Sequence, residues 1–203
     1  MKKLTANSKQ LTAPKKTGIF GGSFNPIHTG HIALARQLRE LAGLDEVWLM
    51  VSPQNPLKQQ ATLLDDDLRL QMARTALADE PFIEVSDYEF HLPRPSYTWN
   101  TLRALKDDYP NREFVLLIGG DNWEHFPRWY RADDIIRNYQ LIVYPRRGSD
   151  IDLTSLPSTV TVIEAELLDI SSTDIRRRVR EGKTIAGLVP PCIIPAVTTY
   201  YAR

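Results

Sequence analysis

The chain alternates between short runs of consecutive apolar residues and longer stretches in which apolar residues recur every three or four positions. The runs are typical of strands buried on both faces of a sheet, and the longer stretches are typical of amphipathic helices. Gly43 follows the first helical stretch and favours its termination there. The pattern predicts strands at 18–20, 46–51, 82–85, 113–118, 141–144 and 160–163, and helices at 30–42, 65–79, 96–108, 133–138 and 172–181.

Strands and helices thus alternate along most of the sequence, which predicts an α/β fold. The expected architecture is a Rossmann-like, doubly wound, mostly parallel sheet with helices on both faces. Ligands of such sheets bind beyond the carboxyl ends of the strands, so the loops that follow the strands are where chemistry is expected. Ser96 or Thr98 is the expected N-terminal cap of the third helix.

The length of 203 residues fits one domain with a sizeable core. Residues 1–16 are polar and basic and lack the apolar segment of a signal peptide, so we expect a flexible N-terminal extension before a single domain at 17–203. The 25 Lys and Arg residues balance 25 Asp and Glu residues, which gives no basic footprint for nucleic acid. No apolar run approaches a membrane span in length. We expect a cytoplasmic protein that binds neither nucleic acid nor membrane.

Cysteine usage also limits the chemistry. The single cysteine, Cys192, excludes an internal disulfide, and no Cys and His spacing resembles a zinc site. Cys192 lies in the apolar stretch 191–194, where a buried structural thiol is expected.

The loop between the first predicted strand and the first predicted helix, 21–31, reads Gly-Gly-Ser-Phe-Asn-Pro-Ile-His-Thr-Gly-His. Its glycines let the backbone approach a ligand closely, Ser23 adds a hydroxyl, and Gly30 leaves room for a nucleotide against the helix. His28 and His31 stand at the start of that helix, so both can face the same spot. The helix N-terminus favours an anion there, and imidazole can donate to phosphate oxygens. The loop therefore predicts a phosphate site.

Two other interpretations of this loop are weaker. The histidines could only satisfy local backbone groups, or they could share a metal ion. The sequence offers no third ligand nearby, so we expect no metal site made by the protein.

A second segment, 170–178, reads Ile-Ser-Ser-Thr-Asp-Ile-Arg-Arg-Arg and opens the last predicted helix. Ser171 and Asp174 have the spacing of a capping box, which by itself is a structural motif. Arg176 lies in the first turn, where the helix dipole disfavours a cation, and an anionic ligand would explain it. Arg177 and Arg178 are expected to be solvated.

The two segments resemble the glycine-rich His-x-Gly-His loop and the Ile-Ser-Ser-Thr-x-Ile-Arg motif of the nicotinate and nicotinamide mononucleotide adenylyltransferases. With the segments between them, the resemblance covers about 17–201 and implies one nucleotidyltransferase domain. It implies that His28, His31 and Arg176 are catalytic. It also implies that ATP or its phosphates contact Gly21, Gly22, Ser23, Phe24, Gly30, Ser171, Ser172 and Thr173.

Three middle segments are similar to further parts of the same family. The stretch 95–98 resembles one whose counterparts of Tyr97 and Thr98 contact the mononucleotide, and 118–121 resembles a strand end at which Gly119 and Asp121 would face the nucleotide ribose. The remaining segment is 126–129, in which Trp129 would stack on the pyridine ring. A core or interface position for Trp129 stays an equal alternative.

The sequence departs from the family pattern at two places. Asn25 stands where many members have Asp, and we expect it to contact the mononucleotide. The stretch 56–58 reads Pro-Leu-Lys where many members have Pro-Pro-His-Lys. Lys58 can still reach a phosphate as a point charge and is a candidate catalytic residue, but one donor is missing.

The reaction implied is transfer of AMP from ATP to the 5′-phosphate of nicotinate mononucleotide, giving deamido-NAD and pyrophosphate, with Mg²⁺ carried in by ATP. ATP and the mononucleotide are the expected partners, and a homo-oligomer stays open. The alternatives are a sibling enzyme for nicotinamide mononucleotide or phosphopantetheine, and a nucleotide-binding regulator without catalysis. Tyr97, Thr98 and Trp129 suit a pyridine mononucleotide better than a pantetheine arm. Intact His28, His31 and Arg176 argue against a regulator.

Overall fold

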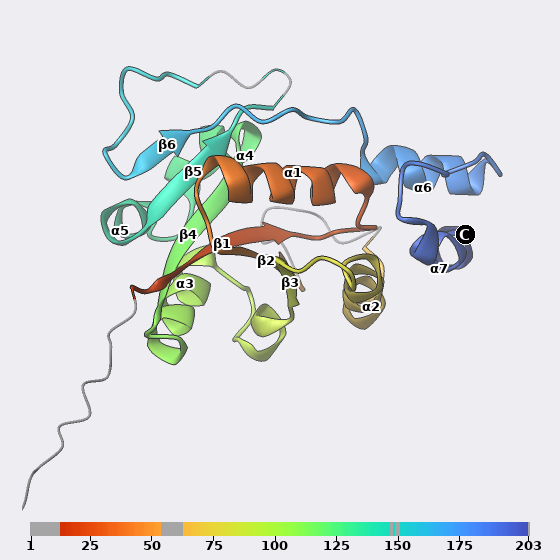
Figure 1. Cartoon of the computed structure of the whole chain (residues 1–203), viewed down its shortest axis with the longest axis horizontal. Helices are drawn as coiled ribbons and strands as arrows, with labels where there is room; N and C mark the ends of the chain where they lie inside the picture. The colour runs from red at the N-terminus through yellow and green to blue at the C-terminus, as the bar shows by residue number, and fades with distance from the viewer. Residues whose placement is uncertain (1–12, 54–62, 147, 149–150, 203) are drawn as a thin grey trace, which may run out of the picture.

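The structure is a computed structural model, and it describes residues 13–53, 63–146, 148 and 151–202. Its centre is one six-stranded parallel sheet in the order β3-β2-β1-β4-β5-β6. Figure 1 shows these strands running in one direction through the middle of the molecule. The strands are β1 (Lys15–Gly22), β2 (Glu46–Val51), β3 (Ile83–Ser86), β4 (Arg112–Gly119), β5 (Gln140–Tyr144) and β6 (Val160–Val162).

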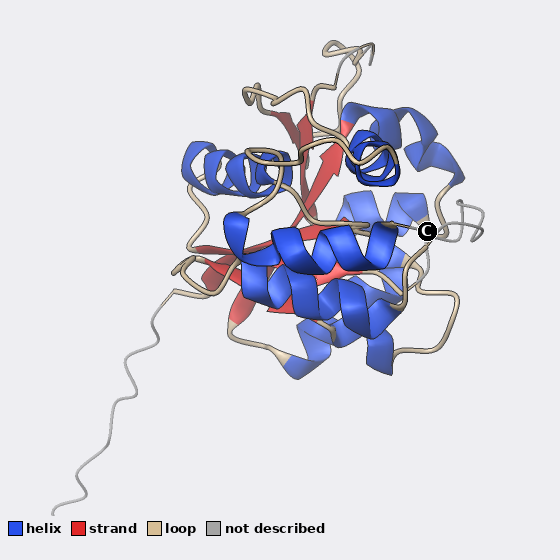
Figure 2. Cartoon of the chain, turned by 90° about the vertical axis from the view of Figure 1, so that its right-hand side faces the viewer, coloured by secondary structure: helices blue, strands red, loops and turns tan. Residues whose placement is uncertain are grey.

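Helices cover both faces of the sheet (Figure 2), which confirms the predicted doubly wound α/β fold. One face packs against α1, α2, α6 and α7, and the other packs against α3 and α5, so the sheet separates two hydrophobic cores. Short 3₁₀ helices lie at Tyr88–His91, Phe126–Arg128 and Pro191–Ile193. The α-helices are α1 (Thr29–Leu41), α2 (Asp66–Ala76), α3 (Thr98–Asp108), α4 (Gly120–His125), α5 (Ala132–Asn138), α6 (Ser172–Arg180) and α7 (Ile194–Tyr201).

The first strand begins earlier than expected. Lys15 pairs with Arg112 and Lys16 with Glu113 in β4, so these two lysines belong to the sheet and not to an extension that ends at residue 16. Sequence periodicity missed them because a strand that begins with charged residues has no apolar signal at its start. Residues 1–12 of the predicted extension lie outside the described residues.

Two further expectations are wrong in detail. Tyr97, and neither Ser96 nor Thr98, is the N-cap residue of α3, and no capping side chain is found for it within the described part of the chain. Cys192 is exposed, because the 3₁₀ turn that contains it directs Ile193 into the core and leaves the thiol outside. Helices α4 and α7 were not predicted.

Helix α1 ends as its sequence predicts. Gly43 has φ +61°, its N–H donates to Glu40 O over 3.2 Å, and Leu44 N–H donates to Arg39 O over 2.9 Å. These two bonds form a Schellman motif, which needs a residue that tolerates positive φ. In the part of the chain that the structure describes, none of the helices is long and apolar enough to cross a membrane.

Candidate active site

A cavity of about 840 Å³ lies beyond the carboxyl ends of the strands. The chain builds the sheet outward from β1 through β2 to β3, and then from β4 through β5 to β6 on the other side. The strand order therefore reverses between β1 and β4, which is where ligands of such sheets bind. Figure 1 shows α6 and α7 near the start of α1, beyond these strand ends.

The loop after β1 forms one wall of this cavity. A side chain at Gly21 would meet only open space, so its backbone is accessible from the cavity. A Cβ at Gly22 would lie 2.9 Å from Cζ of Phe24, whose ring is buried at 2% exposure. Phe24 therefore lines the cavity from beneath the loop, and it packs edge-on against the ring of His31, with 5.0 Å between ring centroids.

The two loop histidines form a stacked pair at the start of α1. Their ring centroids are 3.6 Å apart and the ring planes differ by 20°. His28 is the N-cap residue, and its Nδ1 accepts from the backbone N–H of His31 over 3.3 Å. A neutral His28 must then carry its proton on Nε2, which makes that nitrogen a donor. Gly30 serves this arrangement, since a Cβ there would lie 3.1 Å from Nδ1 of His28.

Both histidines are held neutral. Burial, and to a lesser degree the charge of Arg146, lower the pKa of His28 to about 4. Burial also lowers the pKa of His31 well below its usual value, with smaller effects of His28 and Arg146. Nδ1 of His31 is buried without a hydrogen-bond partner among the described residues, so Nε2 is the nitrogen that can meet a ligand. The pair can thus donate hydrogen bonds without adding charge.

Stability should depend on pH through His28. The unfolded chain takes up a proton below the usual pKa of 6.5 and the folded chain only near 4, so this contribution is complete above pH 6.5 and is lost as the pH falls towards 4. The difference corresponds to about 3 kcal/mol. Asparagine can keep the N-cap acceptor but cannot titrate. Urea unfolding of wild type and His28→Asn from pH 7.5 to 4.5 should show a steeper loss for wild type; parallel curves would contradict the assignment.

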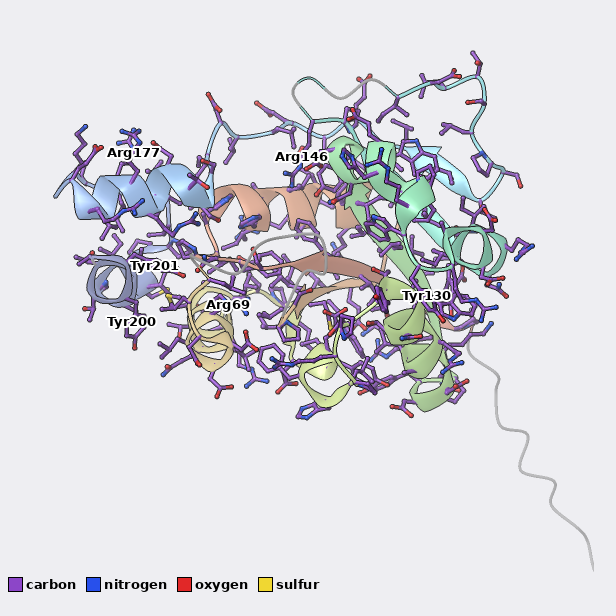
Figure 3. All side chains as sticks on the ribbon, turned by 180° about the vertical axis from the view of Figure 1, so that it is seen from behind. Arg69, Tyr130, Arg146, Arg177, Tyr200 and Tyr201 are labelled. Atoms are coloured by element: carbon purple, nitrogen blue, oxygen red, sulfur yellow. The ribbon has the colours of Figure 1, made fainter. Side chains whose placement is uncertain are left out.

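Side-chain donors from α2 and α6 hold the backbone of the loop. The guanidinium of Arg69 in α2 is fully buried, and it donates to Ser23 O, to Leu64 O over 2.9 Å and to the carboxylate of Asp66. Figure 3 places Arg69 on α2 near Tyr201 of α7. The loop position is therefore fixed by buried donors from outside the loop.

The α6 segment touches the same loop. Ser171 caps α6, since its hydroxyl accepts from the backbone N–H of Asp174 over 3.1 Å. The carboxylate of Asp174 forms ion pairs with Arg177 and Arg178 and does not make the reciprocal hydrogen bond of a capping box. Both arginines lie at the surface as predicted, and Figure 3 shows Arg177 on the outer side of α6.

Ser172 and Arg176 make the contacts between α6 and the loop. Ser172 Oγ donates to Pro26 O over 2.8 Å, and Arg176 Nη1 donates to Asn25 O over 2.6 Å. Arg176 also donates to Thr173 Oγ1 over 3.2 Å. Both segments that were singled out in the sequence therefore meet at one cavity, which Ser171, Ser172, Thr173 and Arg176 line.

A residue that sequence reasoning missed, Arg146, completes this wall. It follows β5, lines the cavity, and lies 3.4 Å from a carboxylate oxygen of Asp121 and 3.3 Å from the hydroxyl of Tyr144. Among the predicted site residues that the structure describes, only Gly119 does not line the cavity. A Cβ there would lie 2.5 Å from Asp121 Oδ1 and 2.7 Å from Arg146 Nε, so a larger residue would displace these two side chains.

Aromatic residues line another part of the cavity, among them Tyr97 and Trp129. Tyr130 is 50% exposed, and its ring lies 4.9 Å from that of Tyr97. Trp129 is half-buried, packs on Phe126 with 5.2 Å between centroids, and keeps Nε1 buried without a partner among the described residues. Trp129 therefore combines a core contact with a place in the cavity wall.

A buried carboxyl group was also missed. Glu89 is 7% exposed and lines the cavity, where it accepts from Ser52 Oγ over 2.8 Å and from Thr101 Oγ1 over 2.9 Å. Burial raises the pKa of this carboxyl against the opposing effect of the two hydroxyls. Thr98, at the start of α3, lines the cavity too. The predicted Lys58 lies outside the described residues.

The parallel α/β fold and the meeting of segments 21–31 and 170–178 at one cavity define a nucleotidyltransferase of the cytidylyltransferase-like class. The model of that family matches residues 19–178. Proteins named "Probable nicotinate-nucleotide adenylyltransferase" from Bacteroides fragilis and Bacteroides thetaiotaomicron are 52% and 48% identical to this chain. The alignments cover 89% and 91% of this chain and 90% and 92% of the relatives. The chain therefore belongs to the nicotinate-nucleotide adenylyltransferase family.

Solved structures support the fold. A Plasmodium falciparum nicotinic acid mononucleotide adenylyltransferase complexed with NaAD superposes with a TM-score of 0.74 at 22% identity, over 92% of this chain and 98% of that one. At that identity the similarity shows the shared α/β architecture.

Proposed function

We propose that the protein transfers AMP from ATP to the 5′-phosphate of nicotinate mononucleotide, giving deamido-NAD and pyrophosphate. The observation that carries this proposal is a single cavity lined both by phosphate-binding groups and by aromatic rings. The groups in its wall that can bind phosphate are His28, His31, Arg146 and Arg176. The family membership of the chain supports the same reaction.

The phosphate groups of ATP are proposed to bind where α1 and α6 begin. Neutral His28 and His31 would donate hydrogen bonds to phosphate oxygens, and Arg146 and Arg176 would supply positive charge. Lys58 is a further proposed cationic contact. The accessible backbone of Gly21 would allow close approach of the phosphates, and Asp121 in the first turn of α4 would face the ribose.

The chemical step needs little beyond positioning. An oxygen of the mononucleotide phosphate attacks the α-phosphorus of ATP, a new P–O bond forms, and the bond to the β-phosphate oxygen breaks as pyrophosphate leaves. The attacking phosphate is already ionised, so no side chain has to act as a base. Rate acceleration then comes from alignment of the two phosphates and from donors placed where negative charge develops.

A divalent cation fits this site as a companion of ATP. Within the described residues no three His, Cys, Asp or Glu side chains gather in a way that could hold a metal ion. Phosphate oxygens of ATP would therefore supply most ligands of Mg²⁺. Asp121 would be a nearby carboxylate in the part of the cavity that is proposed to bind ATP. When bound, Mg²⁺ would neutralise part of the triphosphate charge.

The mononucleotide is proposed to bind among Asn25, Tyr97, Thr98 and Trp129. The indole of Trp129 would stack on the pyridine ring, an interaction between flat rings worth roughly 0.5–1.5 kcal/mol beyond the buried area. Stacking does not distinguish nicotinate from nicotinamide. The preference for the acid is supported by the names of the relatives and by the similarity of the 95–98 and 126–129 segments to acid-preferring enzymes.

The purified protein with ATP, Mg²⁺ and nicotinate mononucleotide is expected to release pyrophosphate and form deamido-NAD. Parallel assays with nicotinamide mononucleotide and phosphopantetheine should give lower kcat/KM values. Product is identified by mass spectrometry, and pyrophosphate release gives the rates. Equal kcat/KM for the acid and amide would overturn the acid preference alone. Turnover of phosphopantetheine without turnover of either mononucleotide would overturn the substrate assignment.

A further inference from the structure

The side chain of Asn25 is held by a residue from α7, far away in the sequence. The hydroxyl of Tyr201 donates to Oδ1 of Asn25 over 2.6 Å. Both residues are buried, at 6% and 5% exposure, and Asn25 lines the cavity. Figure 3 shows Tyr201 directed towards the interior beside α2 and α6, whereas Tyr200 points to the other side of α7. The last helix of the described chain thus contacts the candidate active site directly.

The contacts determine which way the Asn25 amide faces. Oδ1 also accepts from the backbone N–H of Leu64 over 3.3 Å, so two donors meet the same oxygen. An amide has one acceptor end and one donor end, and a reversed amide would set its N–H₂ group against the backbone N–H of Leu64, which can only donate. With Oδ1 on this side, the Tyr201 hydroxyl supplies the second and shorter hydrogen bond to it. Burial raises the pKa of Tyr201, so its hydroxyl stays protonated and remains a donor at any physiological pH. The N–H₂ group of Asn25 is therefore fixed on the side opposite Tyr201.

Resting on the proposed function, we propose that Tyr201 is a positioning residue for the mononucleotide. Through its hydroxyl it holds the Asn25 amide so that the N–H₂ group can donate to an acceptor oxygen of that substrate. Acceptor oxygens are what a nucleotide phosphate and a pyridine carboxylate present. The backbone of Asn25 is held separately, by Arg176, so Tyr201 controls the side-chain orientation and not the path of the loop.

Tyr201→Phe tests this role because it removes the hydroxyl and keeps the ring. One donor at Oδ1 then remains, the backbone N–H of Leu64 over 3.3 Å, so the amide is held less firmly in the orientation that directs its N–H₂ group away from Tyr201. A hydrogen bond of this kind corresponds to a change of up to about tenfold. We expect kcat/KM for nicotinate mononucleotide to fall about five- to tenfold, while the KM for ATP changes less than about twofold.

Tyr200→Phe is the matched control, since Tyr200 neighbours Tyr201 on α7 and packs against the same core. It should leave both substrates within about twofold of wild type. A double-mutant cycle of Tyr201→Phe with Asn25→Ala separates an effect that acts through the Asn25 side chain from a general effect on stability. If Tyr201 acts through Asn25, adding Tyr201→Phe to Asn25→Ala should change the kinetics no further, whereas independent effects would add.

The outcomes distinguish this inference from the proposed function. If wild type forms deamido-NAD and Tyr201→Phe behaves like Tyr200→Phe, the inference is wrong and the proposed function stands. An equal loss for both substrates, or a loss that adds to that of Asn25→Ala, would assign Tyr201 a structural role only. Absence of turnover by wild type would overturn the proposed function and the inference together.

Discussion

His31→Ala is expected to lower kcat by ~100- to 1,000-fold, the usual effect of removing one donor that acts on charge developing in the transition state. His31 stacks on His28 and presents Nε2 as its usable nitrogen, because Nδ1 is buried away from solvent. Alanine removes this donor and leaves the start of α1 in place, since the capping nitrogen belongs to His28. The loss should therefore be catalytic to a much greater degree than structural.

His91→Ala is the matched control for this change. His91 is exposed, its only ion pair in the described structure is a 3.9 Å contact with Asp87, and it lies outside the cavity. Its replacement should leave kcat within about twofold of wild type. Steady-state kinetics and thermal unfolding of both variants make the comparison. A folded His31→Ala protein with wild-type turnover would remove His31 from the mechanism.

Arg176→Ala is expected to lower kcat/KM about 100-fold, which corresponds to about 2.7 kcal/mol. The substitution removes a partly buried cation from the cavity wall and also the bond from Nη1 to Asn25 O. Loss of a charged, partly desolvated contact commonly has an effect of this size. Arg176→Lys should be intermediate, because an ammonium keeps the charge but cannot bond Asn25 O and a phosphate with the same planar geometry.

The neighbouring Arg177→Ala provides the control on the same helix. The Arg177 side chain is 53% exposed and forms ion pairs with Asp174 and Glu181 at the surface. Such pairs contribute little to stability, and their loss should leave kcat/KM within about twofold. Both variants are assayed with ATP and mononucleotide varied in turn. Equal losses for Arg176→Ala and Arg177→Ala would indicate a general effect of charge on α6 and would contradict the specific role.

Local patterns predicted the sheet well because buried parallel strands have strong apolar signals. The strand 46–51 has the predicted bounds, and Gly43 ends α1 as expected. Helix α7 was missed for a physical reason: its sequence, Ile-Pro-Ala-Val-Thr-Thr-Tyr-Tyr, is rich in β-branched and aromatic residues that have low helix propensity. Burial of Val197 and Tyr201 against the core favours the helix over that local preference.

The sequence by itself predicted a phosphate site in the loop after β1 and determined that its two histidines lie together, because the glycines and histidines are contiguous and a single helix start brings His28 and His31 face to face. The tertiary structure decided what surrounds them. Arg146 follows β5 and Glu89 follows β3, and both reach the cavity because parallel strands bring their carboxyl ends to one edge. Tyr201 lies in α7 and reaches the loop because that helix packs beside it. The same packing determines that both histidines are neutral, since their low pKa values come from burial and from a distant arginine that no local pattern connects to them.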